Sequence, residues 1–165
     1  AHPIHEYAPW GMNFKEKDEH WFLEGWASYI ELKAIEDTGI FDTSSRWARL
    51  YNSWQAHLSG GDNRDWPLGT EQDIEDANVR EYVHYYKGPL VTYLLAQEAL
   101  SATNGQKTLE DFMGYVYPKY KGFKEDVPLR DELESFFGHD FGEFWDTYID
   151  EEGTVPDIFT TMAPN

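Results

Sequence analysis

Apolar and aromatic residues recur at intervals of three and four along most of this chain, and the two-residue alternation of a β-strand is nearly absent. Glycine, proline and cap-forming residues separate the periodic stretches. The expected helices run from Asp18 to a stop at Gly39, from Thr43 or Ser44 to Leu58, over 73–84, from Pro89 to Asn104–Gly105, from Thr108 onward, from Val127–Pro128 to Phe137–Gly138, and from Asp140 to Tyr148. Residues 60–72 are expected to form the longest loop, and 85–89 an interruption. We therefore predict an all-α fold of about seven helices in one domain, 1–165.

Composition limits the classes of partner. The chain has 165 residues, of which 41% are hydrophobic and 17% aromatic, so it can bury a substantial core. Thirty-one acidic residues against thirteen basic ones give a net charge of −18, which repels nucleic acid and anionic membrane surfaces. No apolar run reaches the length of about 18 residues that a membrane span needs. We expect no nucleic acid and no membrane among its partners.

Cysteine is absent, which excludes disulfides and thiolate metal sites. Any transition-metal site in this chain must therefore use histidine and carboxylate ligands. The first residues contain no initiator methionine and lack the charged-then-apolar layout of a signal peptide. We expect the natural N-terminus to lie upstream.

One segment points to chemistry. Residues 20–29 read His-Trp-Phe-Leu-Glu-Gly-Trp-Ala-Ser-Tyr, and Glu31 follows two positions later. A lone glutamate on a helix is usually a salt-bridge or surface acid. This string, however, resembles the third-ligand helix of gluzincin metallopeptidases, in which an Asn-Glu-Gly-Phe-Ala-x-Tyr-x-Glu segment supplies a zinc-binding carboxylate. The resemblance implies the helical C-terminal lobe of a thermolysin-like catalytic domain, with Glu24 as third zinc ligand and Glu31 orienting a histidine ligand.

A second segment, Tyr85-Tyr86-Lys87-Gly88, is similar to the Tyr-Glu-Lys-Gly segment of M1-type aminopeptidases and to a Tyr-Tyr-Asp-Lys-Gly stretch of M61-type enzymes. In the M1-type enzymes the tyrosine hydroxyl stabilises the oxyanion of the tetrahedral intermediate. An ungapped match assigns this role to Tyr85, which lies 61 positions after Glu24. By itself the tetrapeptide more often marks a surface loop that holds a packed tyrosine. Together with the Glu24 motif at the family distance, the catalytic and the surface-loop interpretations are equally supported.

The same resemblance requires two histidines from an HExxH helix, where i, i+4 spacing places both imidazoles on one face. No HExxH occurs in this chain, and His2 and His5 are the candidates. His5 stands at the family distance from Glu24, but the first histidine and the catalytic glutamate would then fall at Ala1 and His2. Alternatively, Ala1-His2 end a truncated His-Glu-x-Ala-His motif.

A third alignment begins the motif at His5-Glu6 and places Pro9 at the second ligand position. We favour the truncated motif over a degenerate site. Both histidines could also be ordinary residues near the terminus. The other histidines have no ligand spacing and are expected to be packed or on the surface, with His84 close to the predicted cleft: His20, His57, His84 and His139.

The sequence thus favours part of a zinc-dependent aminopeptidase that hydrolyses peptides. Glu24 with His2 or His5 would bind zinc, and Tyr85 would stabilise the oxyanion. Because the general base is missing, this chain alone is expected to be inactive and to need the missing N-terminal part of the same protein. The alternative is a non-catalytic helical module for binding or assembly that descends from the same fold.

Overall fold

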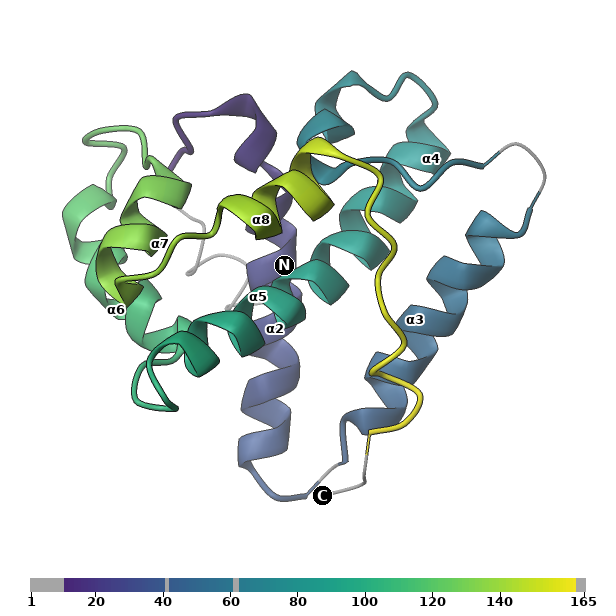
Figure 1. Cartoon of the computed structure of the whole chain (residues 1–165), viewed down its shortest axis with the longest axis horizontal. Coiled ribbons are helices and arrows are strands. Elements are labelled where there is room, and N and C mark those ends of the chain that lie inside the picture. Colours follow the sequence, from purple (N-terminus) through teal and green to yellow (C-terminus); the bar gives the residue numbers. More distant parts are fainter. Residues whose placement is uncertain (1–10, 41, 61–62, 163–165) are drawn as a thin grey trace.

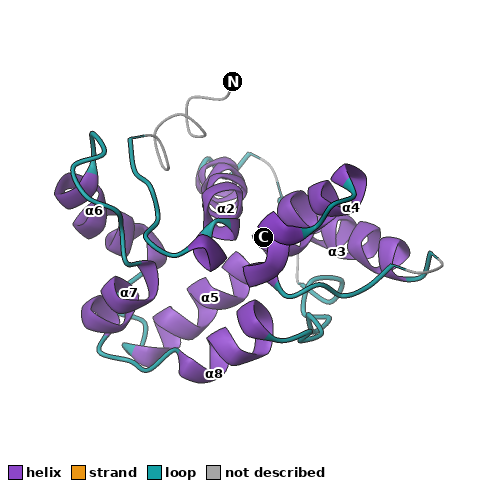
Figure 2. Cartoon of the chain, turned by 90° about the horizontal axis from the view of Figure 1, so that it is seen from above, coloured by secondary structure: helices purple, strands orange, loops and turns teal. Residues whose placement is uncertain are grey.

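The computed structural model describes residues 11–40, 42–60 and 63–162, which form helices joined by loops (Figures 1 and 2). Within these ranges there is no β-strand, although an isolated bridge pairs Phe14 with Val127. The α-helices are α2 (Trp21–Asp37), α3 (Ser44–Leu58), α4 (Ala77–Tyr82), α5 (Gly88–Ala102), α6 (Leu109–Tyr120), α7 (Leu129–Phe137) and α8 (Gly142–Phe144). The prediction of an all-α fold with about seven helices is confirmed.

Four further helical segments complete the described part of the chain. Two are 3-10 helices, η1 (Lys17–Glu19) and η2 (Leu68–Asp73), and two are π-helices, η3 (Val83–Lys87) and η4 (Trp145–Asp150). The helix η2 lies at the end of the stretch that was expected to be a loop. No helix of the described residues is long and apolar enough to cross a bilayer.

Helices α2 and α5 cross at the centre of the molecule (Figure 1). A Cβ atom on Gly25 would lie 2.2 Å from Oγ1 of Thr92 and 3.0 Å from the carbonyl oxygen of Gly88. Because glycine has no side chain, the two backbones can approach this closely. The glycine at position 25 therefore sets the distance between the two central helices, whereas a Cβ on Gly88 would lie at an ordinary 3.5 Å from the carbonyl oxygen of Trp21.

The interruption expected at residues 85–89 is wrong, because the backbone stays helical from α4 through η3 into α5. The side chain of Asp76 caps the start of α4 by accepting hydrogen bonds from the backbone N–H groups of Asn78 and Val79. Proline at position 89 has no N–H, and its ring would clash with the carbonyl four residues earlier in a regular α-helix. The chain accommodates this proline with a π-turn, in which the N–H of Gly88 donates to the carbonyl of Val83.

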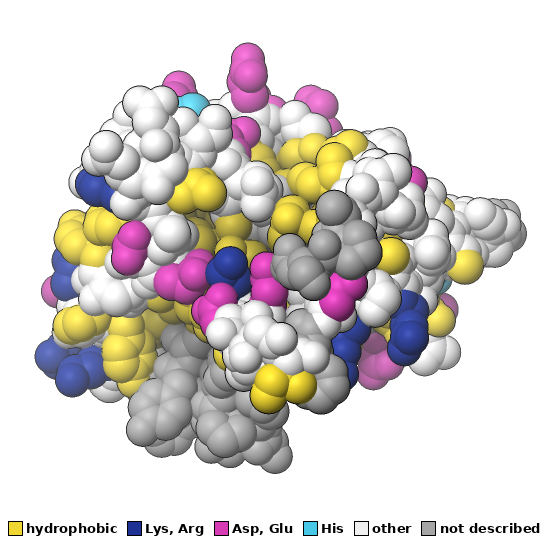
Figure 3. All heavy atoms as spheres, turned by 90° about the horizontal axis from the view of Figure 1, so that it is seen from below, with side chains coloured by type: hydrophobic (Ala, Val, Ile, Leu, Met, Phe, Trp, Pro, Cys, Tyr) yellow, Lys and Arg dark blue, Asp and Glu magenta, His cyan; other side chains and the backbone are white. Residues whose placement is uncertain are grey.

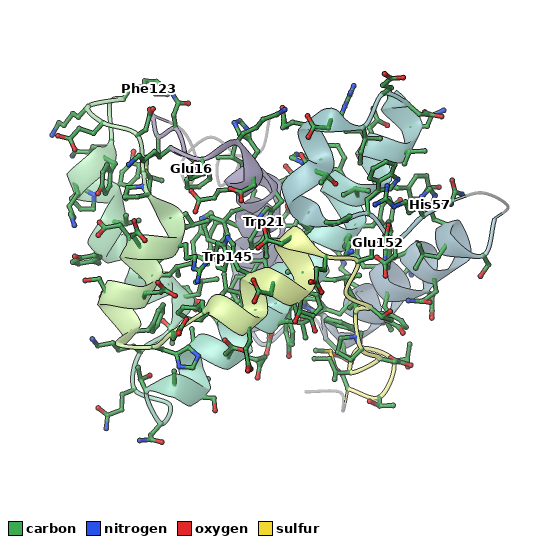
Figure 4. All side chains as sticks on the ribbon, turned by 45° about the horizontal axis from the view of Figure 1, so that its top comes forward. Glu16, Trp21, His57, Phe123, Trp145 and Glu152 are labelled. Atoms are coloured by element: carbon green, nitrogen blue, oxygen red, sulfur yellow. The ribbon has the colours of Figure 1, made fainter. Side chains whose placement is uncertain are left out.

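The core is built largely from aromatic side chains. Trp21 of α2 and Trp145 of η4 meet edge-on at a centroid distance of 6.2 Å (Figure 4). The C-terminal segment runs alongside α3 in Figure 1, and its Phe159 stacks on Trp47 and Tyr51 of that helix. The long aromatic network means that helices distant in sequence share one continuous core.

Helices α6 and α7 pack as a pair beside this core (Figure 2). Thr108 and Asp111 form the reciprocal capping box that starts α6. Helix α7 has no side-chain cap from its own N-cap residue. Instead the buried carboxylate of Glu19 accepts hydrogen bonds from the backbone N–H groups of Leu129 at 3.2 Å and Arg130 at 2.9 Å. A residue far upstream in sequence thus caps this helix.

Candidate functional site

Glu24 lies in the first turn of α2 and is partly buried. Its Oε1 accepts a hydrogen bond from the hydroxyl of Ser28, one turn further along, at 3.1 Å. Glu31 follows Ser28 at the next helical interval, so the three polar residues share one side of α2. The hydroxyl of Ser28 restrains the Glu24 carboxylate, as a neighbour of a metal ligand does.

The other two predicted zinc ligands, His2 and His5, lie outside the described residues. Among the residues that the structure describes, no group of three histidine or acidic side chains is placed to hold a metal ion. Glu24 could supply one carboxylate ligand of the kind that zinc accepts. The proximity of Glu24 to either histidine stays a prediction.

Tyr85 projects from the π-turn η3. Its side chain is 50% exposed, and its ring contacts His84 edge-on at 4.8 Å. Within the described part of the chain its hydroxyl has no hydrogen-bond partner. A phenol in this position can donate to a ligand.

The neighbouring Tyr86 points in a different direction and is half-buried. Its ring stacks on Tyr82 at 4.9 Å, and Tyr82 stacks on His57 at 4.3 Å. His57 (Figure 4) belongs to α3, its ring stacks on Trp54 of the same helix and on Tyr82 of α4, and its burial lowers its pKa. Of the two expected environments, packed or on the surface, His57 has the packed one. The π-turn therefore separates two adjacent tyrosines, one exposed and one packed.

Lys87 ends η3 and is fully buried. Its ammonium group donates to Oδ1 of Asp65 at 2.6 Å and to the carbonyl oxygen of Trp66 at 2.7 Å. Burial lowers the pKa of Lys87, and the hydrogen bond and charge of Asp65 oppose that shift. A buried ammonium with a carboxylate and a carbonyl partner fixes η3 to the segment before η2.

A His–carboxylate pair that no sequence pattern indicates lies beside Tyr85. Nδ1 of His84 pairs with Oε1 of Glu71, a residue of η2 that is only 2% exposed. The second oxygen of Glu71 is buried and has no hydrogen-bond partner among the described residues. A carboxylate held this way orients the imidazole ring and leaves Nε2 for another partner. No ligand motif has the 13-residue spacing of Glu71 and His84, which is why the pair was missed.

His139, which the sequence placed among packed or surface histidines, is partly buried and pairs with Glu98 of α5 at 3.1 Å. His20 ends η1 and is partly buried. Neither lies beside Glu24 or Tyr85 in any described contact. The sequence expectation for these two histidines is confirmed.

A groove of about 400 Å³ lies between α2 and α3. The residues that line it are Ser28, Glu31, Leu32, Arg46, Arg49, Leu50, Ser53 and Tyr86. Because Ser28 also binds Glu24, the groove adjoins the predicted metal ligand. Tyr86, and not Tyr85, is the tyrosine of η3 that reaches it.

One face of the molecule exposes hydrophobic, acidic and basic side chains together. On the face seen in Figure 3, hydrophobic side chains are exposed among acidic side chains and scattered basic ones. The acidic side chains reflect the net charge of −18. Basic side chains are therefore scarcer than acidic ones as possible contacts for a ligand.

No protein-family model, no curated protein and no solved structure matches this chain significantly.

Proposed function

We propose that this chain is the helical part of a gluzincin-type zinc peptidase of aminopeptidase character. Glu24 is the third zinc ligand, beside two histidines of which His2 or His5 is one, and Tyr85 donates a hydrogen bond to the oxyanion. The substrates are peptides. The glutamate that acts as general base lies upstream of the chain, so the chain by itself is inactive.

The observation that carries this proposal is the crossing of α2 and α5. Gly25 follows Glu24 directly, and Gly88 ends the Tyr-Tyr-Lys-Gly segment. A Cβ on Gly25 would lie 3.0 Å from the carbonyl oxygen of Gly88, so the two motifs touch through their glycines. Two segments about sixty positions apart that resemble parts of one active site are thus packed against each other.

The neighbouring residues support the assigned roles. The hydroxyl of Ser28 restrains the Glu24 carboxylate. The buried Lys87–Asp65 pair fixes η3, from which Tyr85 projects with its hydroxyl unbonded in the described part of the chain. A bound zinc ion would polarise the scissile carbonyl, and a fixed phenol adds a hydrogen bond where negative charge develops.

Metal analysis of a longer protein that includes the residues upstream of Ala1 tests this proposal. The purified protein should contain about one zinc per chain, and Glu24→Ala should lose most of it. Asp37→Asn, at the exposed end of the same helix, is the matched control and should keep the metal. Equal zinc in Glu24→Ala and wild type contradicts the ligand assignment.

The 165-residue chain itself should bind zinc weakly, because it lacks an intact HExxH helix. Tight stoichiometric zinc in calorimetry would instead indicate a local site of His2, His5 and Glu24. A longer protein that folds without zinc and does not hydrolyse peptides would favour the non-catalytic binding module.

A further inference from the structure

We propose that the groove between α2 and α3 binds a carboxylate of a peptide through Arg46 and Arg49. The ligand is either the C-terminal carboxylate or an Asp or Glu side chain. Only the claim that this peptide is a substrate rests on the proposed function. Its binding to the groove is an independent claim.

The arginines of the described structure fall into two groups. Arg64 pairs with Glu152, Arg130 pairs with Glu134, and Arg80 donates to the carbonyl oxygen of Ile74. Arg46 and Arg49 have no hydrogen bond or ion pair with any described residue, although both line the groove. In a chain with thirty-one acidic residues, carboxylate partners for an arginine are abundant. The groove therefore keeps two guanidinium groups available to a ligand.

The helix geometry directs both side chains to the same place. Arg46 and Arg49 are three residues apart on α3, which puts them on one face, and Leu50 and Ser53 continue that face along the groove. Helix α2 ends and α3 begins at the short connection between Asp37 and Ser44, and the two helices diverge from it in Figure 1. The groove thus has a basic wall on α3.

The opposite wall is different. Ser28, Glu31 and Leu32 of α2 face the arginines across the groove, and Tyr86 of η3 contributes a ring. Glu31 repels an anion from this wall, so a ligand carboxylate is directed toward α3. The leucines provide apolar surface for the stem of a side chain. The volume of about 400 Å³ lies within the range of small-ligand sites.

The position of the groove relates it to the predicted chemistry. Ser28 lines the groove and donates to Glu24, so a ligand in the groove lies within about one helical turn of that carboxylate. A planar guanidinium binds a carboxylate with two parallel hydrogen bonds, which gives geometric selectivity as well as affinity. The groove would anchor one end of a peptide whose other part extends toward Glu24.

Direct binding to the 165-residue chain tests the groove without any catalysis. The probes are tetra-alanine with a free C-terminus, tetra-alanine amide, and the amide of Ala-Ala-Glu-Ala, each titrated by calorimetry or NMR. At least one carboxylate-bearing peptide should bind more tightly than tetra-alanine amide, and the comparison shows which carboxylate is recognised. Equal affinity for all three peptides overturns the proposal.

The double variant Arg46→Gln/Arg49→Gln should weaken the preferred peptide by about tenfold to a hundredfold, as expected when charged hydrogen bonds are lost. Lys121→Gln/Lys124→Gln removes the same two charges from the exposed loop before α7 and should leave the affinity unchanged. Equal losses in both double variants would indicate general electrostatic attraction and overturn the site. Circular dichroism spectra of each variant verify that the helices are intact.

The result also separates this inference from the proposed function. If the longer protein lacks zinc but the arginine-dependent binding persists, carboxylate binding by the groove is supported and the peptidase proposal is contradicted. If the longer protein hydrolyses peptides and neither hydrolysis nor binding depends on Arg46 and Arg49, carboxylate binding by the groove is contradicted and the peptidase proposal is supported.

Discussion

The two π-helical segments stabilise buried charge in opposite ways. In η3, the fully buried Lys87 is paired with a carboxylate, Asp65, at 2.6 Å. Beside η4, the buried Glu19 lines the same hollow as Trp145. Among the described residues it is bonded by backbone N–H groups, including those of Leu129 and Arg130, and forms no ion pair. Burial raises the pKa of Glu19 to about 7, although these hydrogen bonds oppose the shift. In both residues burial is the largest influence on the pKa and favours the neutral form, and the hydrogen bonds oppose it.

The two segments also differ in what they expose. Tyr85 of η3 is 50% exposed, whereas Trp145 of η4 is 3% exposed and packs on Trp21. π-turns are frequent at functional sites, yet η4 presents only core packing on its aromatic side. Of these two segments, η3 is the one in which buried polar contacts hold an accessible side chain.

The largest expected effect is at the buried pair of η3. Lys87→Met leaves Asp65 without its partner and should lower the free energy of unfolding by about 3–5 kcal/mol, measured by urea denaturation. Lys17→Met removes an exposed ion pair with Asp73 and should cost less than about 1 kcal/mol. Similar losses in both variants would show that Lys87 contributes no more than a surface pair. Lys87→Met/Asp65→Leu should recover part of the stability.

Next in size is the effect expected at the exposed tyrosine if the longer protein is the peptidase that we propose. Tyr85→Phe should lower kcat by about 10²- to 10³-fold with little change in KM, as expected when one oxyanion donor is lost. Tyr86→Phe is the matched control from the same turn and should have a milder effect. Equal activity of Tyr85→Phe and wild type contradicts the role of Tyr85 as oxyanion donor. A larger loss of kcat in Tyr86→Phe than in Tyr85→Phe would assign that role to Tyr86, which lines the groove.

The third prediction concerns Glu19 and the pH dependence of the free energy of unfolding. Its folded pKa of about 7 lies above its ordinary value of 4.5, so the folded state binds the proton more tightly between these values. The free energy of unfolding should therefore fall as pH rises from 4.5 to 7, by at most about 1.4 kcal/mol per pH unit. Glu19→Gln should flatten this part of the stability profile. Glu75→Gln, an exposed control, should keep the wild-type slope.

A smaller effect is expected at the helix crossing that supports η3. Gly25→Ala places a methyl group 2.2 Å from Oγ1 of Thr92, and it should lower the stability by about 1–3 kcal/mol. Gly114→Ala in α6 meets no atom within 4 Å and should raise the stability by about 0.5–1 kcal/mol, because alanine favours the helix. Thermal melting of both variants measures the contrast. A neutral Gly25→Ala would show that α2 and α5 can separate without loss.

Local sequence signals located most of the helices. The ends at Gly39 and Gly138 lie in the left-handed region that glycine adopts readily, and the expected helix start at Thr108 is confirmed by its capping box with Asp111. The helical periodicity of the Leu-Glu-Gly-Trp segment also placed Glu24 on α2. These features depend on residues within a few positions of one another, so the sequence alone could predict them.

Long-range packing determined the rest. Pro89 suggested a break, but the π-turn continues the helix because Lys87 and Gly88 are held by Asp65 and by α2. The capping of α7 by Glu19 joins residues that local patterns do not relate. These contacts arise when distant segments are buried together and must satisfy their polar groups.

The amino-acid sequence was enough to predict an acidic, aromatic-rich, all-α chain and to identify the two segments that suggest a peptidase. Three features became visible only in the folded chain: Gly25 and Gly88 bring those segments into contact, Glu71 holds His84, and Arg46 and Arg49 border a groove beside Ser28, the partner of Glu24. Helical periodicity assigns each residue to a face of its own helix. Which faces meet depends on the packing of the whole core, because side chains on different helices become neighbours only when the helices cross.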